Sequence, residues 1–398
     1  MDPVRNPFSP DAGRPPPELA GRDALLEDAS VALQRTAQGR AGRSHILYGL
    51  RGTGKTVLLN TIRKEAHAHD YLTTFIEAPE GKGLLTLLYP EIREVLRQFS
   101  LYENAKAHAH AAARALASMV KAWKVSVGDV TLSVEPETGV ADSGSLERDL
   151  SALFLRVGQA AQAAGRAWAL FIDEVQYLSK EDLGALIVAV HRANQEDLPI
   201  IFFGAGLPQV AGIMGNTKSY AERLFLFVQV DHLDKAAAFD AIRLPVEKEG
   251  ESITDAGLEA IFAHTQGYPY FLQEWGFHAW KVAQASPIDV PDIDAATQAA
   301  IHRLDESFFR VRLDRLTLTE KAYVQAMAGL PEGPPYRSKD VAAALGKTVN
   351  QISSARDGII KKGMAYSPAH GDIAFTVPMF AAYLTRATGQ DTGEPRLL

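Results

Sequence analysis

The chain has 398 residues, no cysteine and a formal net charge of -7. The length excludes a single small domain, the missing cysteine excludes disulfides and thiolate chemistry, and an ordinary hydrophobic share of 46% excludes disorder. No apolar run approaches the roughly 18 residues of a membrane span and no basic-then-apolar leader opens the chain, so we expect a cytoplasmic protein without a membrane segment.

Helices and strands alternate over the first hundred residues. Six prolines among residues 1–20 indicate an arm without periodic structure. The spacing of apolar residues then predicts a helix at 23–35, a buried strand at 44–50, a helix at 55–67, a strand at 71–76 and a helix at 84–100. This alternation is typical of a parallel sheet covered by helices.

An insertion interrupts the alternation at about 101–145. It contains an alanine-rich helix, an alternating segment at 125–135 that predicts a β-hairpin, and a loop. The predicted elements that follow are a helix at 146–164, a strand at 168–172, a helix at 180–194, and strands at 199–203 and 224–230. Only helices are predicted from 233 to 287, and the segment 317–388 predicts three helices and then two short strands.

A phosphate-binding motif lies between the first strand and the next helix. Residues 49–56 read GLRGTGKT, which fits GxxxxGK[ST] in the context that the motif requires. Glycines let successive N–H groups face inward, and the helix N-terminus adds partial positive charge. Lys55 is expected at the β and γ phosphates, and the Thr56 hydroxyl on Mg²⁺. The nucleotide-binding residues predicted here are Gly49, Leu50, Arg51, Gly52, Thr53, Gly54, Lys55, Thr56 and Val57.

Two carboxylates end a later buried strand. Residues 168–172 are continuously apolar, and Asp173 and Glu174 follow directly. Open parallel sheets place ligands at the carboxyl ends of their strands, so both side chains are expected near the phosphates. Asp173 is predicted to hold Mg²⁺ through water, and Glu174 to orient or deprotonate the attacking water.

With these motifs in this order, the chain resembles the AAA+ ATPases, and within them the branch of origin-recognition-type initiators and STAND-related ATPases. The resemblance implies an α/β fold: a P-loop parallel sheet with helices on both faces, a helical lid and a C-terminal winged helix-turn-helix. It divides the chain into an arm at 1–20, an ATPase base at 21–233, a lid at 234–300, a winged helix at 301–388 and a tail at 389–398. It also implies that Gly21 and Arg22, in an AGRD segment, line the adenine pocket.

Other positions agree with the resemblance or depart from it. Arg223 precedes the last strand of the sheet, where the resemblance implies an arginine finger that reaches a neighbouring subunit in a homo-oligomer. The alternative is a surface arginine paired with Glu222 or Asp231. Tyr268 and Pro269, in GYPY, match the STAND element that contacts the base, at the position where initiators carry a second-sensor arginine. The strand after the acidic one ends in FGAG, without the polar first sensor, so we expect slow hydrolysis.

The last segment resembles a winged helix-turn-helix and is basic. Residues 315–388 hold nine Lys or Arg against five Asp or Glu, a net charge of +4 that leaves -11 for the rest of the chain. The third helix is predicted to turn polar side chains outward, toward base edges or phosphates, with two lysines beside the wing. The predicted DNA-binding residues are Asn350, Gln351, Ser353, Ser354, Arg356, Lys361 and Lys362.

The sequence therefore predicts an ATPase that binds ATP and Mg²⁺, with Lys55, Glu174 and Arg223 as catalytic residues. ATP or ADP would control a winged helix that binds DNA. Two alternatives stay open: a nucleotide-held switch whose winged helix binds a protein, and a loader that forms rings or filaments on DNA.

Overall fold

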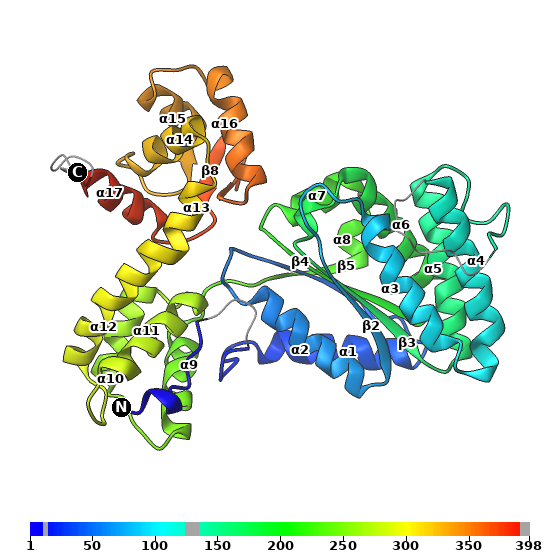
Figure 1. The fold of residues 1–398 in the computed structure, drawn as a ribbon, viewed down its shortest axis with the longest axis horizontal. Coiled ribbons are helices and arrows are strands. Elements are labelled where there is room, and N and C mark those ends of the chain that lie inside the picture. Colours follow the sequence, from blue (N-terminus) through cyan, green and yellow to red (C-terminus); the bar gives the residue numbers. More distant parts are fainter. Residues whose placement is uncertain (11–14, 124–134, 391–398) are drawn as a thin grey trace, which may run out of the picture.

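The computed structural model describes residues 1–10, 15–123 and 135–390 (Figure 1). Its base contains a five-stranded sheet in the order β2-β3-β4-β1-β5, and every pair of neighbours is parallel. The strands are β1 (Ser44–Tyr48), β2 (Tyr71–Glu77), β3 (Ala167–Asp173), β4 (Ile200–Gly206) and β5 (Phe225–Gln229). The predicted parallel sheet is thereby confirmed. β4 is longer than expected and includes the small residues at 204–206.

Helices cover both faces of this sheet, as Figure 1 shows. One face carries α1 (Asp23–Ala37) and α2 (Lys55–Ala68). The other carries α3 (Leu84–Phe99), α5 (Leu146–Ala163), α6 (Lys180–Gln195), α7 (Val210–Thr217) and α8 (Ala221–Leu224). β3 is buried along its whole length, since alternate side chains enter the two cores. This burial on both faces explains why its sequence is a continuous apolar run.

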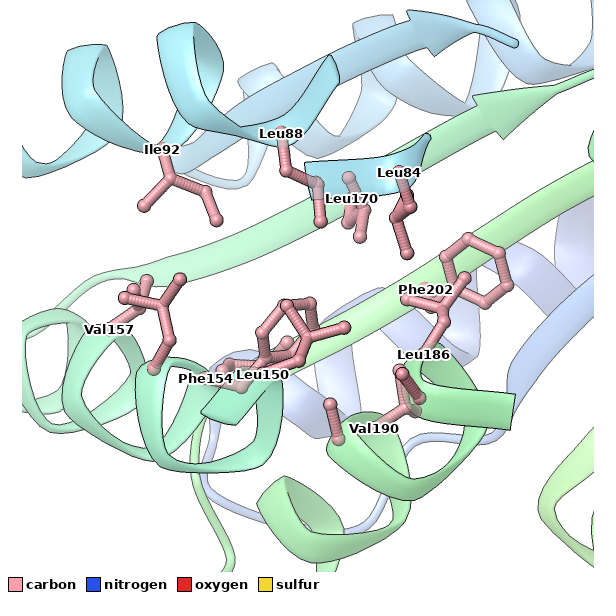
Figure 2. Packing of buried hydrophobic residues seen from close by; sticks show 14 of the residues in the cluster. Leu84, Leu88, Ile92, Leu150, Phe154, Val157, Leu170, Leu186, Val190 and Phe202 are labelled. Atoms are coloured by element: carbon pink, nitrogen blue, oxygen red, sulfur yellow. The ribbon is translucent and has the colours of Figure 1, made fainter. Parts of the chain in front are cut away.

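The larger core is formed between helices and sheet. Leu84, Leu88 and Ile92 follow a helical spacing on α3 and face Phe154 of α5 and Leu170 of β3 (Figure 2). The alanine-rich helix of the insertion is α4 (Lys106–Ala122), preceded by the short turn η2 (Glu103–Ala105), and it packs on α3 and α5. The hairpin predicted at 125–135 lies, apart from its last residue, outside the described residues.

After β5 the chain forms a layer of four helices, called here the lid. They are α9 (Lys235–Lys248), α10 (Asp255–Thr265), α11 (Pro269–Val282) and α12 (Val290–Arg303). The helix does not end at the expected boundary near 300: it continues through the π-helical turn η4 (Leu304–Phe309) into α13 (Arg310–Asp314). One hydrophobic core runs from the lid into the following residues, where the Phe309 ring packs on Tyr383 at a centroid distance of 5.2 Å.

The remaining residues, 315–390, form the C-terminal domain. Its elements are α14 (Leu318–Ala328), β6 (Tyr336–Arg337), α15 (Ser338–Ala344), α16 (Val349–Lys361), β7 (Ala365–Tyr366), β8 (Asp372–Phe375) and α17 (Phe380–Gln390). The three strands form an antiparallel sheet in the order β6-β8-β7. The predicted three helices and last two strands are present. β6 and α17 were not predicted, and β6 is too short for an alternating pattern to show.

Residues 1–8 pack against the lid rather than extending freely. They include the turn η1 (Pro3–Arg5), and Phe8 is only 3% exposed. The Phe8 ring lies so near Gly276 of α11 that a Cβ there would be 2.8 Å from it. The indole Nε1 of Trp280 donates to the carbonyl of Asp2 at 2.8 Å. Among the described residues, no helix combines the length and apolar character that a bilayer crossing requires.

Candidate nucleotide-binding site

The glycine-rich turn joins the end of β1 to the start of α2, as predicted. Gly52 and Gly54 have φ values of +83° and +95°, which side chains other than glycine rarely adopt. Lys55, the first residue of α2, is buried and its Nζ donates to the carbonyls of Gly49 at 2.9 Å and Leu50 at 2.5 Å. Burial lowers the pKa of Lys55 to about 8, opposed by the charges of the nearby carboxylates. The ammonium group is therefore held directly under the turn.

The two carboxylates lie beside this turn because β1 and β3 end at the same edge of the sheet. Asp173 is 4% exposed, and its Oδ2 accepts a hydrogen bond from the Thr56 hydroxyl at 2.5 Å. Burial raises the pKa of Asp173, while the bonds from Thr56 and from the backbone of Glu174 oppose that rise. Glu174 follows in a left-handed conformation, with φ of 55°, so its side chain leaves the strand direction.

Neighbouring polar groups fix Glu174. Its carboxylate accepts a hydrogen bond from Nε2 of Gln176 and lies 3.6 Å from Nη1 of Arg51. The same Gln176 side chain accepts from the backbone N–H of Leu207 at 3.0 Å, directly after β4. The small residues that end β4 leave room for this amide: a Cβ at Gly206 would lie 2.6 Å from its Oε1. Gln176 thus supplies a polar group where the expected first sensor is missing.

A cavity of about 290 Å³ opens over the turn. Base, arm and lid all contribute to its wall. The predicted residues among the lining are Arg22, Arg51, Gly52, Thr53, Gly54, Lys55, Thr56, Val57, Asp173, Glu174 and Pro269. Gly49 and Leu50 lie beneath the turn as acceptors for Lys55 and are not part of the lining.

Gly21 and Tyr268 lie just behind the cavity wall. A Cβ at Gly21 would be 2.7 Å from the Cβ of Ala237, so this glycine lets the chain pass close to α9. Tyr268 is fully buried, and its hydroxyl would lie 2.9 Å from a Cβ at Gly52. Tyr270, at the start of α11, donates its backbone N–H to the carbonyl of Gly52 at 3.2 Å. The GYPY segment therefore rests on the phosphate-binding turn.

Several lining residues have no counterpart in the sequence prediction. The arm contributes to the wall, and so do Gln273, Phe308 and Arg312 of the lid and the helix that leaves it. Tyr270 also lines the cavity and belongs to the predicted GYPY segment, in which only Tyr268 and Pro269 were named as nucleotide-binding. Arg22, which was predicted, donates to the carbonyl of Asp231, and burial lowers its pKa against the opposing charge of Asp231. No local motif marks the missed residues, because they lie far along the chain from the turn that they face.

Arg223 is not brought to the phosphate-binding turn of its own chain. β1 and β5 are parallel, with Ser44 opposite Phe225, so α8 lies at the edge of the sheet opposite the end of β1. The side chain of Arg223 is exposed there. Glu222 and Arg223 lie in one short helix, where the backbone carbonyl of Glu222 accepts from Nη2 of Arg43.

The predicted DNA-binding residues, which lie on α16 and directly after it, divide into two groups. Asn350, Gln351, Ser353, Ser354 and Lys361 are exposed, as expected. Arg356 is instead half-buried, since Nε donates to Ser338 and Nη2 to Ser367 and to the carbonyl of Asp372. Lys362 also turns inward and donates to Glu320 at 2.6 Å. Both side chains bind the domain together: Arg356 connects α16 to α15 and to the segment from Ser367 to Asp372, and Lys362 connects the end of α16 to α14.

The donors beside the turn fit a magnesium ion. The Thr56 hydroxyl and the Asp173 carboxylate are hard oxygen ligands already in contact, and the raised pKa of Asp173 marks a charge that a cation would stabilise. Within the described parts of the chain, no group of three or more His, Asp or Glu could hold a metal. A site of one or two protein ligands completed by phosphate oxygens is typical of Mg²⁺.

Comparisons with known proteins agree with this geometry. Residues 18–203 match the AAA ATPase domain family, and residues 306–384 match a domain of unknown function, DUF8462. No curated protein sequence matches the chain. Solved structures that are similar over most of their length include the following two. The Walker-type ATPase PABY2304 of Pyrococcus abyssi has a TM-score of 0.57 at 16% identity, covering 94% of this chain and 99% of that one.

The second is the Aeropyrum pernix ORC1 protein, solved in complex with DNA. It has a TM-score of 0.51 at 14% identity, covering 97% of this chain and 96% of that one. At such identities the likeness concerns the fold alone. Together with the family match over residues 18–203, this fold supports an AAA+ P-loop ATPase.

Proposed function

We propose that the chain binds ATP with Mg²⁺ in the 290 Å³ cavity and hydrolyses it. The observation that carries the proposal is the contact of Thr56 with Asp173 directly above the buried Lys55, with Glu174 beside them. Inward-facing N–H groups of the turn and the N-terminus of α2 would bind the phosphates. Bound Mg²⁺ would neutralise charge on the phosphate oxygens, held by Thr56 and Asp173.

Glu174 is the group we assign to the attacking water. Its carboxylate is held by Gln176 and Arg51 at the phosphate edge of the sheet, so it can accept a hydrogen bond from a water in line with the γ-phosphate. Lys55 stabilises the charge that develops on the transferring phosphoryl group. The base, the arm and the lid together limit access of other water to the site.

Two variants and a control test this assignment. Lys55→Ala is expected to abolish ATP binding, whereas Glu174→Gln is expected to bind ATP and lose turnover by about 100-fold or more. Glu77→Gln serves as the control, because Glu77 is an exposed carboxylate opposite Asp173 at the same edge of the sheet. Phosphate release and nucleotide titration are the measurements. Equal turnover in the wild type and all three variants would contradict the proposal.

We further propose that the C-terminal domain is a winged helix that binds DNA through α16. Support comes from its order of helices and strands, from its net charge of +4, and from the exposed polar residues of α16. The ORC1 structure similar to this chain contains DNA. A lysine on a phosphate contributes about one unit to the slope of log affinity against log salt. Lys361→Ala should reduce that slope for a DNA duplex by about one, while Lys64→Ala on α2 should not.

A switch function is favoured by a different observation. The backbone N–H of Arg51 in the phosphate-binding turn donates to the carbonyl of Thr376 in the C-terminal domain at 3.3 Å. Nucleotide bound at the turn would therefore act on the placement of that domain, whether its partner is DNA or a protein. If the affinity for DNA does not depend on salt concentration and is unchanged in Lys361→Ala, a protein partner is favoured over DNA.

We also propose that Arg223 acts on a neighbouring copy of the chain. Its position at the edge of the sheet opposite the phosphate-binding turn supports an action in trans. Sedimentation in the presence of ATP and DNA should then show oligomers that Arg223→Ala removes. Monomers that persist under those conditions would rule this role out.

A further inference from the structure

Arg312 enters the proposed ATP cavity from outside the ATPase base. It lies in α13, the last turn of the helix that runs from the lid toward the C-terminal domain (Figure 1). Its side chain lines the same cavity as Lys55 and Arg51. The guanidinium carbon lies 3.6 Å from the centre of the Phe308 ring, and Nη1 donates to the carbonyl of Phe308 at 2.7 Å. These contacts fix the orientation of the planar group and engage one of its five N–H donors.

The charges that act most strongly on this guanidinium do not come from carboxylates. They are those of Arg51 and Arg315, together with the phenols of Tyr268 and Tyr270. Burial, and next the charge of Arg51, lower the pKa of Arg312 to about 10. No carboxylate among the described residues forms an ion pair with it, unlike Arg310, which lies 3.9 Å from Asp314. A half-buried cation beside a like charge is a site for an anionic ligand.

Arg51 supplies the other half of the site from the phosphate-binding turn. Its Nη2 donates to the hydroxyl of Tyr177 at 2.8 Å and its Nη1 lies near Glu174, while its Nε is buried without a hydrogen-bond partner. It is packed so closely against the C-terminal domain that a Cβ at Gly363 would overlap its guanidinium group. Arg51 belongs to the base and Arg312 to the body formed by lid and C-terminal domain, so the two like charges meet where these bodies join.

We propose that Arg312 and Arg51 together bind the terminal phosphate of ATP, so that the phosphate links the base to the body that carries the C-terminal domain. This inference rests on the proposed ATP binding and adds a residue and a coupling to it. The fork of an arginine matches phosphate oxygens and forms two parallel charge-assisted bonds. ADP lacks that phosphate and leaves the two guanidinium groups to repel each other across the joint.

Binding of two nucleotides to the full chain tests the proposal. The probes are ADP and the β,γ-imido analogue of ATP, each titrated with Mg²⁺ by calorimetry. Arg312→Ala is expected to lower the affinity for the triphosphate analogue by about tenfold or more, and the affinity for ADP by less than about twofold. Only the triphosphate has a phosphate that reaches the guanidinium group. Arg312→Lys keeps the charge but not the planar group with its parallel donors, so its affinity for the triphosphate analogue should lie between those of the wild type and Arg312→Ala. Arg310→Ala is the matched control, an exposed arginine of the same helix that lies 3.9 Å from Asp314.

A double-mutant cycle separates the coupling between the two arginines from the effect of each substitution alone. The losses of binding free energy caused by Arg51→Met and Arg312→Met should be non-additive for the triphosphate analogue and additive for ADP. Equal losses for both nucleotides in Arg312→Ala, or additivity with the triphosphate, would overturn this inference while the proposed ATP binding stands. A wild-type protein that binds neither nucleotide would overturn the proposed function itself.

Discussion

Replacing Gly267 by alanine should destabilise the joint between base and lid. Gly267 has φ of +71°, and an added Cβ would overlap the carbonyl oxygen of Leu233, a backbone atom that cannot turn away like a side chain. The backbone N–H of Leu233 donates to the carbonyl of Gly267 at 2.9 Å, so relief of the overlap also disturbs this bond. The left-handed conformation costs alanine about 1 kcal/mol, and the overlap adds about 1–3 kcal/mol.

Gly250 offers a matched control, since it has φ of +78° and nothing within 4 Å of an added Cβ. Gly250→Ala should therefore lower the free energy of unfolding only by the cost of the left-handed conformation, about 1 kcal/mol. Urea unfolding followed by circular dichroism measures both free energies of unfolding without nucleotide, and the difference between variants should be about 1–3 kcal/mol. The entropy that alanine removes from the unfolded chain is common to both and cancels. Equal losses would refute the argument from the carbonyl overlap.

Three further substitutions are predicted. Gln176→Ala removes the amide that holds Glu174, the proposed catalytic carboxylate. Phosphate release should then fall about 10- to 100-fold while nucleotide affinity stays the same; a parallel loss of affinity would contradict a positioning role. Phe8→Ala empties a buried site and should lower stability by about 3 kcal/mol in thermal unfolding, against about 0.5 kcal/mol or less for Val4→Ala, which is 92% exposed. Lys362→Met leaves a buried carboxylate without its cation and should cost about 2 kcal/mol, whereas the exposed Lys361→Met should be nearly neutral. Equal costs for the two lysine variants would show that the inward contact does not stabilise the domain.

Most elements of the base could be predicted from the sequence, but the short helices α7 and α8 were missed. The longer helices carry a periodic pattern of apolar residues, and the buried strands are short apolar runs. The phosphate-binding turn is also local, because the glycines, Lys55 and Thr56 are contiguous and act within a single turn between β1 and α2. The partner carboxylates of β3 could be found because their position at the end of a buried strand has a definite meaning in a parallel sheet.

The rest of the site depends on contacts between segments far apart in sequence. Arg312 faces the turn only because the helix continues through η4 instead of ending near residue 300. Gln176 reaches Glu174 because that residue leaves β3 in a left-handed conformation, which no spacing pattern indicates. The helical period of α16 identified one face of that helix, but not that the following strands cover Arg356.

The packing of Phe8 determines the order in which the two bodies can be completed. The lid core contains residues from both sides of the base in sequence, since Phe8 belongs to the same cluster as Leu272 and Trp275. During synthesis the first eight residues leave the ribosome long before α11, while the base needs nothing beyond β5 to close its sheet. The base can therefore fold first as a unit, while residues 1–8 stay exposed to solvent until the lid has formed. Once residue 234 has left the ribosome, the nascent chain can carry a folded base whose own N-terminal segment still lacks its binding site.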